Sequence, residues 1–328
     1  MGQHTFTKMR VALATLGCAA AVAGLAPAQK VLVTGAGGRT GRLVLEKLSN
    51  DYRSTFAPIA LARSTKAQKK VAELVPDATI VVADVLDDVA LEAAFAGVDK
   101  VVLCTSAVPS IKILSIIKIL LKKALFFLFN DAGRPEFTFP DRGTPEEVDW
   151  LGAKAQIDAA VRAGVKHFVF VSSMNGTQPD SFLNTIGRRP DGSGGDILLW
   201  KRKAERHLVA SGMAYTIIHP GGLVDEPPSK RELVVGVDDE LLLAGSGPGR
   251  SRSVSRADVA RVCCAALADD RALNTSFDLA SKPVGDGTPT LHARDVFDAL
   301  DGRSCDYAVV LPDPPSIFAA APASSPDL

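Results

Sequence analysis

The amino-acid sequence predicts an α/β fold built on a doubly wound parallel β-sheet. Two observations support this: from Lys30 onwards short Val- and Ile-rich runs alternate with stretches of helical periodicity, and a glycine-rich segment follows the first run. The apolar runs are continuous rather than alternating, which is typical of strands buried on both faces. Connections between parallel strands are almost always right-handed, so helices should cover both faces of the sheet.

The elements can be assigned in chain order. Strands are expected over residues 31–34, 57–62, 79–83, 101–105, 167–172 and 214–219. Helices are expected between them, over residues 41–49, 66–74, 88–95, 144–163 and 198–211. After His219 the sequence becomes rich in Gly and Pro, which indicates a small C-terminal lobe on the substrate side. This lobe should hold a strand pair over 231–237 and 240–244, a helix over 257–267 and a strand over 276–280.

The chain divides into three regions. Residues 29–311 are interpreted as one Rossmann domain with an integrated C-terminal lobe and an insert at 108–132, because no linker-like segment interrupts them. Residues 312–328 are rich in Pro, Ala and Ser and predict a disordered tail.

Residues 1–28 are typical of a targeting segment. Lys8 and Arg10 precede an apolar stretch over residues 11–25, and small residues follow. We interpret this segment as the first step of import into a plastid. The alternative is an Ala-rich N-terminal helix on a cytoplasmic protein.

Charge and cysteine content exclude some functions. Lys plus Arg and Asp plus Glu both number 37, so no overall field would attract a nucleic acid. The five cysteines show no CxxC spacing and the histidines are not clustered, so neither a disulfide framework nor a metal site is predicted. A reducing compartment fits this pattern.

The segment that follows the first strand predicts a dinucleotide site. Gly35, Gly38 and Gly41 have GxxGxxG spacing between a strand and a helix. The first glycine permits a sharp turn, the second lets the backbone approach a pyrophosphate, and the third lets helix and strand pack closely. The predicted cofactor-binding residues here are Thr34, Gly35, Gly37, Gly38, Arg39, Thr40 and Gly41.

The end of the second strand favours NADP(H) over NAD(H). An acidic residue about twenty positions after the glycines would bind the ribose of NAD. The sequence instead has Arg63, which together with Arg39 could clamp a 2′-phosphate, although both arginines could also simply be solvated. Asp84 is expected beside the adenine, and the segment Thr105, Ser106 and Ala107 is expected to pass along the cofactor.

Several motifs along residues 30–300 resemble the atypical short-chain dehydrogenase/reductases, and within them the NmrA-like plant and algal NAD(P)-binding proteins. The resemblance covers the glycine turn and the stretches 133–137, 148–152, 156–160, 171–174, 200–205, 221–223, 256–260 and 278–283. It implies an NAD(P)-binding Rossmann domain with a small C-terminal lobe. It also implies that Pro220 and Gly221 pass the nicotinamide.

The catalytic pattern departs from the wider superfamily, whose members use a Tyr-x-x-x-Lys pair. Lys203 resembles that lysine and is expected to hold the nicotinamide ribose, but Leu199 stands four residues before it. Lys203 could equally lie on a solvated face. Ser172 and Ser173 end the fifth strand, where the superfamily has its substrate-polarising hydroxyl. His219 is a further candidate proton donor.

Two hypotheses about function follow. The first is an NADP(H)-dependent oxidoreductase that transfers hydride to a small carbonyl or quinone-like acceptor, since the cofactor carries the difficult step. The second is a non-catalytic sensor or assembly protein controlled by NADP(H) occupancy. Loss of the tyrosine favours the second, and retention of Ser172, Lys203 and the glycine turn favours the first.

The insert contains an unusual apolar segment over residues 111–129. Its polar residues, Lys112, Ser115, Lys118, Lys122 and Lys123, would form one narrow stripe on a helix. This predicts either a helix lying in a membrane interface or a lid or homodimer contact. Both alternatives predict an apolar small-molecule substrate.

Overall fold

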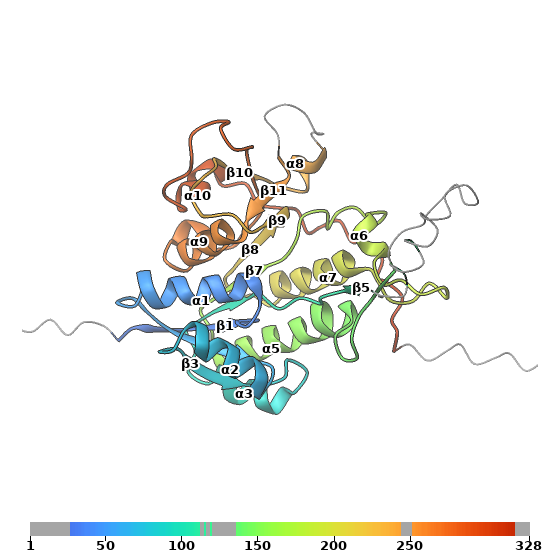
Figure 1. The fold of residues 1–328 in the computed structure, drawn as a ribbon, viewed down its shortest axis with the longest axis horizontal. Helices are drawn as coiled ribbons and strands as arrows, with labels where there is room; N and C mark the ends of the chain where they lie inside the picture. The colour runs from blue at the N-terminus through green and yellow to red at the C-terminus, as the bar shows by residue number, and fades with distance from the viewer. Residues whose placement is uncertain (1–26, 112–114, 116–118, 120–135, 244–250, 319–328) are drawn as a thin grey trace, which may run out of the picture.

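The protein is described here from a computed structural model, which places residues 27–111, 115, 119, 136–243 and 251–318. Its centre is an eight-stranded sheet in the order β10-β12-β8-β7-β4-β1-β2-β3 (Figure 1). All neighbouring strands are parallel except β10, which runs antiparallel to β12. The sheet strands are β1 (Gln29–Thr34), β2 (Phe56–Ala62), β3 (Thr79–Val82), β4 (Lys100–Leu103), β7 (His167–Val171), β8 (Tyr215–Pro220), β10 (Leu233–Gly236) and β12 (Thr275–Ser281).

Helices cover both faces of the sheet, so the doubly wound α/β prediction is confirmed. Side chains alternate across each strand: Val31 and Val33 of β1 pack on one helical layer, and Leu32 packs on the other. The first layer contains α1 (Arg39–Asp51), α2 (Thr65–Leu74), α9 (Arg256–Leu267) and α10 (Asp295–Leu300). The second contains α3 (Asp88–Phe95), α5 (Ala153–Ala163) and α7 (Ile197–Ala210).

The remaining elements are short. The helix expected over 144–163 begins as a π-helical segment, η1 (Glu146–Gly152), and continues as α5. Two small two-stranded sheets pair β9 with β11 and β5 with β6. The other short elements are β5 (Ser110–Ile111), β6 (Phe137–Thr138), α6 (Phe182–Thr185), β9 (Gly222–Val224), β11 (Ser253–Ser255) and η2 (Asp270–Ala272).

One strand prediction in the C-terminal lobe is wrong. Residues 240–243 form a short helix, α8 (Glu240–Leu243), rather than a strand paired with 231–237. Asp238 and Asp239 both have positive φ and turn the chain. Asp239 is then held by the backbone N–H groups of Asn175 and Thr177. β10 pairs instead with β12, which runs antiparallel to it.

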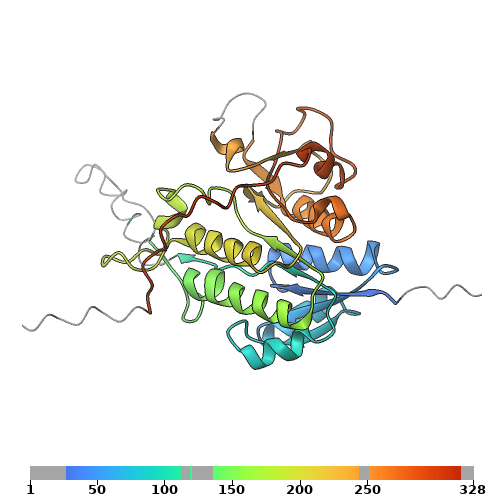
Figure 2. The same cartoon turned by 180° about the vertical axis from the view of Figure 1, so that it is seen from behind.

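The C-terminal segment also differs from the prediction of a disordered tail over 312–328. After α10 the chain runs back from the lobe alongside α7 (Figure 2). Lys203 of α7 donates to Asp313, and Ser316 and the Ile317 N–H both donate to Glu146. We call residues 305–318 the C-terminal strap; residues 319–328 lie outside the described residues.

Two further predictions fall on parts of the chain that the structure does not describe. Nearly all of the predicted targeting segment, and nearly all of the apolar segment 111–129, lie outside the described residues. Among the residues that are placed, no helix is both long and apolar enough to cross a membrane. The four cysteines that are placed are free thiols.

His167 is the first residue of β7, and its side chain is buried and neutral. Thr216 gives its single hydroxyl proton to the Ala272 carbonyl, so its oxygen must accept the 2.9 Å hydrogen bond from Nε2 of His167. The other ring nitrogen, Nδ1, is then unprotonated, and among the described residues it has no partner. Burial, with a smaller effect of Lys100, lowers the pKa of His167 to about 4.

The buried His167 should make the protein less stable in mild acid. The unfolded chain takes up a proton near the ordinary pKa of 6.5, whereas the folded chain does so only near about 4. The free energy of unfolding should therefore fall by up to about 3 kcal/mol as the pH drops through this window. Urea unfolding of the natural chain and of His167→Gln across this pH range measures the effect. Parallel pH profiles for the two proteins would contradict it.

Candidate functional site

The glycine turn brings β1, α1 and the end of β4 into close contact. Gly35 has φ of +65°, and a Cβ there would lie 2.7 Å from the backbone of Cys104. A Cβ on Gly41 would collide with the Gly35 carbonyl oxygen. The first and third glycines are therefore required by backbone contact, as the sequence predicts.

The start of α1 suits an anionic ligand. Its N-terminal cap is Gly38, no side chain among the described residues caps the helix, and its first turn contains no acidic residue. The N–H groups of this turn are thus left for phosphate oxygens. Beneath the turn, the buried Thr34 hydroxyl has no hydrogen-bond partner in the described part of the chain. The residues present fit the pyrophosphate of a dinucleotide.

The two arginines predicted to bind a 2′-phosphate have different surroundings. Arg39 forms an ion pair with Asp225, which follows β9 and also pairs with Arg256. Arg63 lies exposed at the end of β2 and has no ion-pair partner within the described ranges. Ser64 directly after it caps α2 by accepting from the Ala67 N–H, which fixes the backbone there. Arg63 is the freer of the two cations.

The predicted adenine neighbour, Asp84, follows β3. One of its carboxylate oxygens accepts from the Leu86 N–H and the other pairs with Arg142 at 3.3 Å. Asp84 thus begins the loop that leads to α3 and lies, like Arg63, at the carboxyl edge of the sheet.

A buried ion pair supports the segment after β4. The Asp149 carboxylate accepts from the Ala107 N–H at 3.1 Å and pairs with the Lys201 ammonium at 2.8 Å. The Asp149 side chain is 0% exposed and that of Lys201 is 7% exposed. In the same segment the Thr105 hydroxyl accepts from Gln156 of α5, and Ser106 is exposed. Lys201 thus places a fixed positive charge beside the expected cofactor path.

Lys203 lies elsewhere. Its ammonium donates to Asp313 of the strap at 2.7 Å and sits 4.7 Å from the centre of the Trp150 ring. It occupies the outer side of α7, whereas Lys201 lies buried against η1. The structure therefore brings Lys201, and not Lys203, to the end of β4.

Ser172 and Ser173 stand at the carboxyl end of β7, next to β4, as expected. Ser172 donates its proton to Glu205, while Ser173 is partly exposed and donates to the Met174 carbonyl. Met174 in turn donates its N–H to the Pro220 carbonyl, so Pro220 and Gly221 lie beside the end of β7. The glycine turn, Thr105–Ala107, Ser172–Ser173 and Pro220–Gly221 therefore share one edge of the sheet.

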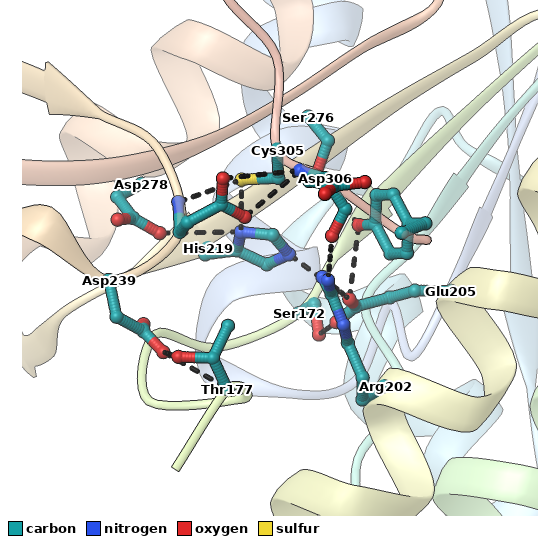
Figure 3. A network of polar contacts seen from close by, with 12 residues as sticks. Ser172, Thr177, Arg202, Glu205, His219, Asp239, Ser276, Asp278, Cys305 and Asp306 are labelled. Carbon is teal, nitrogen blue, oxygen red and sulfur yellow. Dashed lines mark hydrogen bonds and ion pairs between the residues drawn. The ribbon is translucent and has the colours of Figure 1, made fainter. Parts of the chain in front are cut away.

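Glu205 is the centre of a buried polar network (Figure 3). Besides Ser172 it accepts from the Tyr307 hydroxyl at 3.1 Å and from Arg202 at 3.3 Å, and it faces His219 Nε2 at 3.3 Å. Burial alone would raise its pKa, but His219, Arg202 and Ser172 lower the pKa of Glu205 to about 2. The pKa of His219 is raised well above its ordinary value, because Glu205 and Asp278 outweigh the effect of burial.

The sequence alone did not point to Lys201, Glu205 or Tyr307 as residues of the site. For the lysine, the sequence contained one signal. Lys201 and Glu205 are four residues apart and so share one face of the helix, whereas Lys203 lies on another face. Tyr307 carries no local signal, because its partner Glu205 lies far away in the sequence. Four residues before Lys201 stands Ile197, so neither lysine has a tyrosine in the usual position.

Comparison with known proteins agrees with this geometry. Residues 35–270 match a family model described as NAD(P)H-binding. The chain is 43% identical over 267 residues to an uncharacterized chloroplastic protein of Arabidopsis thaliana, covering 81% of this chain and 74% of that protein. It is 39% identical over 272 residues to sanguinarine reductase of Eschscholzia californica, covering 81% and 94%. A solved putative NAD-dependent epimerase/dehydratase from Bacillus halodurans is 25% identical with a TM-score of 0.56, covering 82% and 99%.

The buried ion pair predicts different consequences for the two lysines. Lys201→Met would leave the Asp149 carboxylate buried without its cation and should cost about 3–5 kcal/mol in the free energy of unfolding. Lys203→Met removes a partly exposed contact and should cost about 1 kcal/mol at most. Urea unfolding of both variants tests this. Equal losses would show that the buried pair is not what holds this edge together.

Proposed function

We propose that this chain, which belongs to the NAD(P)H-binding family, is an NADP(H)-dependent oxidoreductase that transfers hydride to a small carbonyl or quinone-like acceptor. The observation that carries the proposal is the row of functional groups along the carboxyl ends of β1, β4, β7 and β8. The chain order reverses between β1 and β4, which is where doubly wound folds bind dinucleotides. The row thus runs from a phosphate cradle to a hydroxyl pair.

Each part of the row has a binding task. The glycine turn and the start of α1 would hold the pyrophosphate, and Arg63 with Arg39 would hold the 2′-phosphate. The segment Thr105–Ala107, stiffened by Asp149, would line the nicotinamide half. When bound, the cofactor supplies the hydride.

The charge on Lys201 gives this edge an electrophilic group. The Lys201 ammonium is nearly fully buried, and Asp149 fixes its position. It would therefore need little reorganisation when negative charge develops on a nearby acceptor oxygen. Ser173, which is partly exposed, adds a hydroxyl on the same side. These groups would polarise an acceptor without a catalytic tyrosine.

Ser172 has a restricted role. Its only proton is given to the Glu205 carboxylate, so its oxygen can accept a further hydrogen bond but cannot donate one. A product that takes its proton from water therefore suits this site best. Quinone-like acceptors have this property, and the reductase name of the Eschscholzia californica relative supports the reaction class.

The proposed location is a plastid. The N-terminal segment has the composition of a targeting sequence, and the Arabidopsis thaliana relative is described as chloroplastic. The free thiols in the described part of the chain are compatible with a reducing stroma.

A second function remains favoured by one observation. Neither Lys201 nor Lys203 has a tyrosine four residues earlier, so the proton-transfer pair of the superfamily is missing. A sensor or assembly protein controlled by NADP(H) would need the binding row but no proton donor. Steady-state NADPH oxidation with a panel of quinones and aldehydes separates the two functions. Absence of turnover with tight NADPH binding would support the sensor.

The different surroundings of Arg63 and Arg39 predict how each arginine contributes to the preference for NADPH over NADH. Arg63→Ala should weaken NADPH binding about tenfold or more and leave NADH binding nearly unchanged, because a charge-assisted contact to phosphate contributes ~1.5–3 kcal/mol. Asp225→Asn, which frees Arg39 from its ion pair, should strengthen NADPH binding. Calorimetric titration with both cofactors measures these effects. Equal affinities of the natural chain for NADPH and NADH would refute the proposed specificity.

A further inference from the structure

Three buried side chains from distant parts of the chain converge behind Ser172. His219 on β8 lies directly opposite Asp278 on β12, and Cys305 begins the strap (Figure 3). His219 Nδ1 lies 3.4 Å from an Asp278 carboxylate oxygen and 3.7 Å from Cys305 Sγ. One donor atom from each residue falls within 4.8 Å of the other two. Nitrogen, thiol sulfur and carboxylate oxygen thus face one point.

Asp278 is poorly satisfied for a buried carboxylate. Its residue is 0% exposed, and besides the His219 ring its one further contact among the described residues is a weak one with the Asp239 backbone N–H. Burial accordingly raises its pKa. Buried carboxylates are normally paired, hydrogen-bonded or bound to a metal. This one has room for a further positive partner.

The charge of the surroundings also favours a cation. The small cavity at this point is lined by four carboxylates, Glu205, Asp238, Asp239 and Asp278, against the cations of Arg202 and His219. The Arg202 guanidinium is directed to Glu205, to the Asp306 carbonyl and over the Tyr307 ring. It therefore does not neutralise Asp278. The excess of carboxylates over cations therefore favours the binding of a cation at this point.

Of the three ligand separations, the two from His219 Nδ1 match a tetrahedral metal site, and the Asp278 oxygen and the Cys305 sulfur lie within 4.8 Å of each other, so binding would draw these two atoms together. Zinc bonds of about 2.0–2.3 Å to N, O and S place neighbouring ligand atoms roughly 3.3 Å (N to O) and 3.6 Å (N to S) apart. The separations from His219 Nδ1 are 3.4 and 3.7 Å. The other nitrogen of this ring faces Glu205, and histidines that bind metals usually hold such a carboxylate on their second nitrogen. Ser172 and Tyr307 fix that carboxylate.

We propose that His219 Nδ1, Asp278 and Cys305 Sγ bind a zinc-like divalent cation, with a fourth position open to the cavity beside Ser173 and Thr177. Binding would form three metal–ligand bonds and release protons from the imidazolium and the thiol to solvent, with no change of oxidation state. The cation would join β8, β12 and the C-terminal strap. The proposal is independent of the oxidoreductase function.

Cobalt(II) substitution tests the site directly. Full-length protein freed of metal with a chelator should take up one equivalent of Co²⁺ and develop a thiolate-to-cobalt charge-transfer band, which added Zn²⁺ removes. Cys305→Ser should abolish the band and weaken Co²⁺ binding about tenfold or more. Cys264→Ser, which alters a buried thiol of α9, should leave both unchanged. Cofactor titration confirms that each variant is folded.

Two outcomes would overturn the proposal. One is the absence of a saturable band in the natural chain. The other is a band that persists in Cys305→Ser. If Cys305→Ser does not fold, Asp278→Asn takes its place: elemental analysis after zinc reloading should give one zinc per natural chain and none for this variant. Equal zinc contents in the two proteins would contradict the site.

Discussion

The burial of the Glu205 carboxylate is the constraint on which this molecule most depends. A charge that is 1% exposed is tolerated only when donors surround it. Here the donors come from the end of β7, from α7 itself, from β8 and from the C-terminal strap, through Ser172, Arg202, His219 and Tyr307. Satisfying one carboxylate therefore fixes the relative positions of the carboxyl edge of the sheet, the C-terminal lobe and the C-terminal strap.

The two ends of the row of functional groups depend on different physical interactions. At the cofactor end the constraint is on the backbone: Gly35 and Gly41 are needed because any side chain there would collide with nearby backbone atoms. At the other end, the buried Asp149–Lys201 pair and the Glu205 network fix the positions of charges that are shielded from water. A binding cradle made of backbone can be retained while the acceptor end changes its chemistry, as the missing tyrosine illustrates.

Local signals account for what the sequence predicts well. The strands and the glycine turn are encoded by contiguous residues, so β1, α1 and the doubly wound sheet follow from pattern alone. The choice between Lys201 and Lys203 depends on which face of α7 is buried, and three basic residues in a row conceal that face. The network around Glu205 depends on Tyr307, whose distance in sequence leaves no pattern to detect. A composition rich in Pro and Ala likewise concealed the contacts of Asp313 and Ser316.

The C-terminal strap has a consequence for how the chain is made. Tyr307 and Cys305 complete a core whose other members lie on β7, α7, β8 and β12, and they are synthesised after all of these. Until the strap has been synthesised, Glu205 and Arg202 lack their partners on it, while the glycine turn and the first half of the sheet are already available to fold. The nascent protein can therefore form its glycine turn early in translation, but the network around Glu205 closes only when the strap reaches α7.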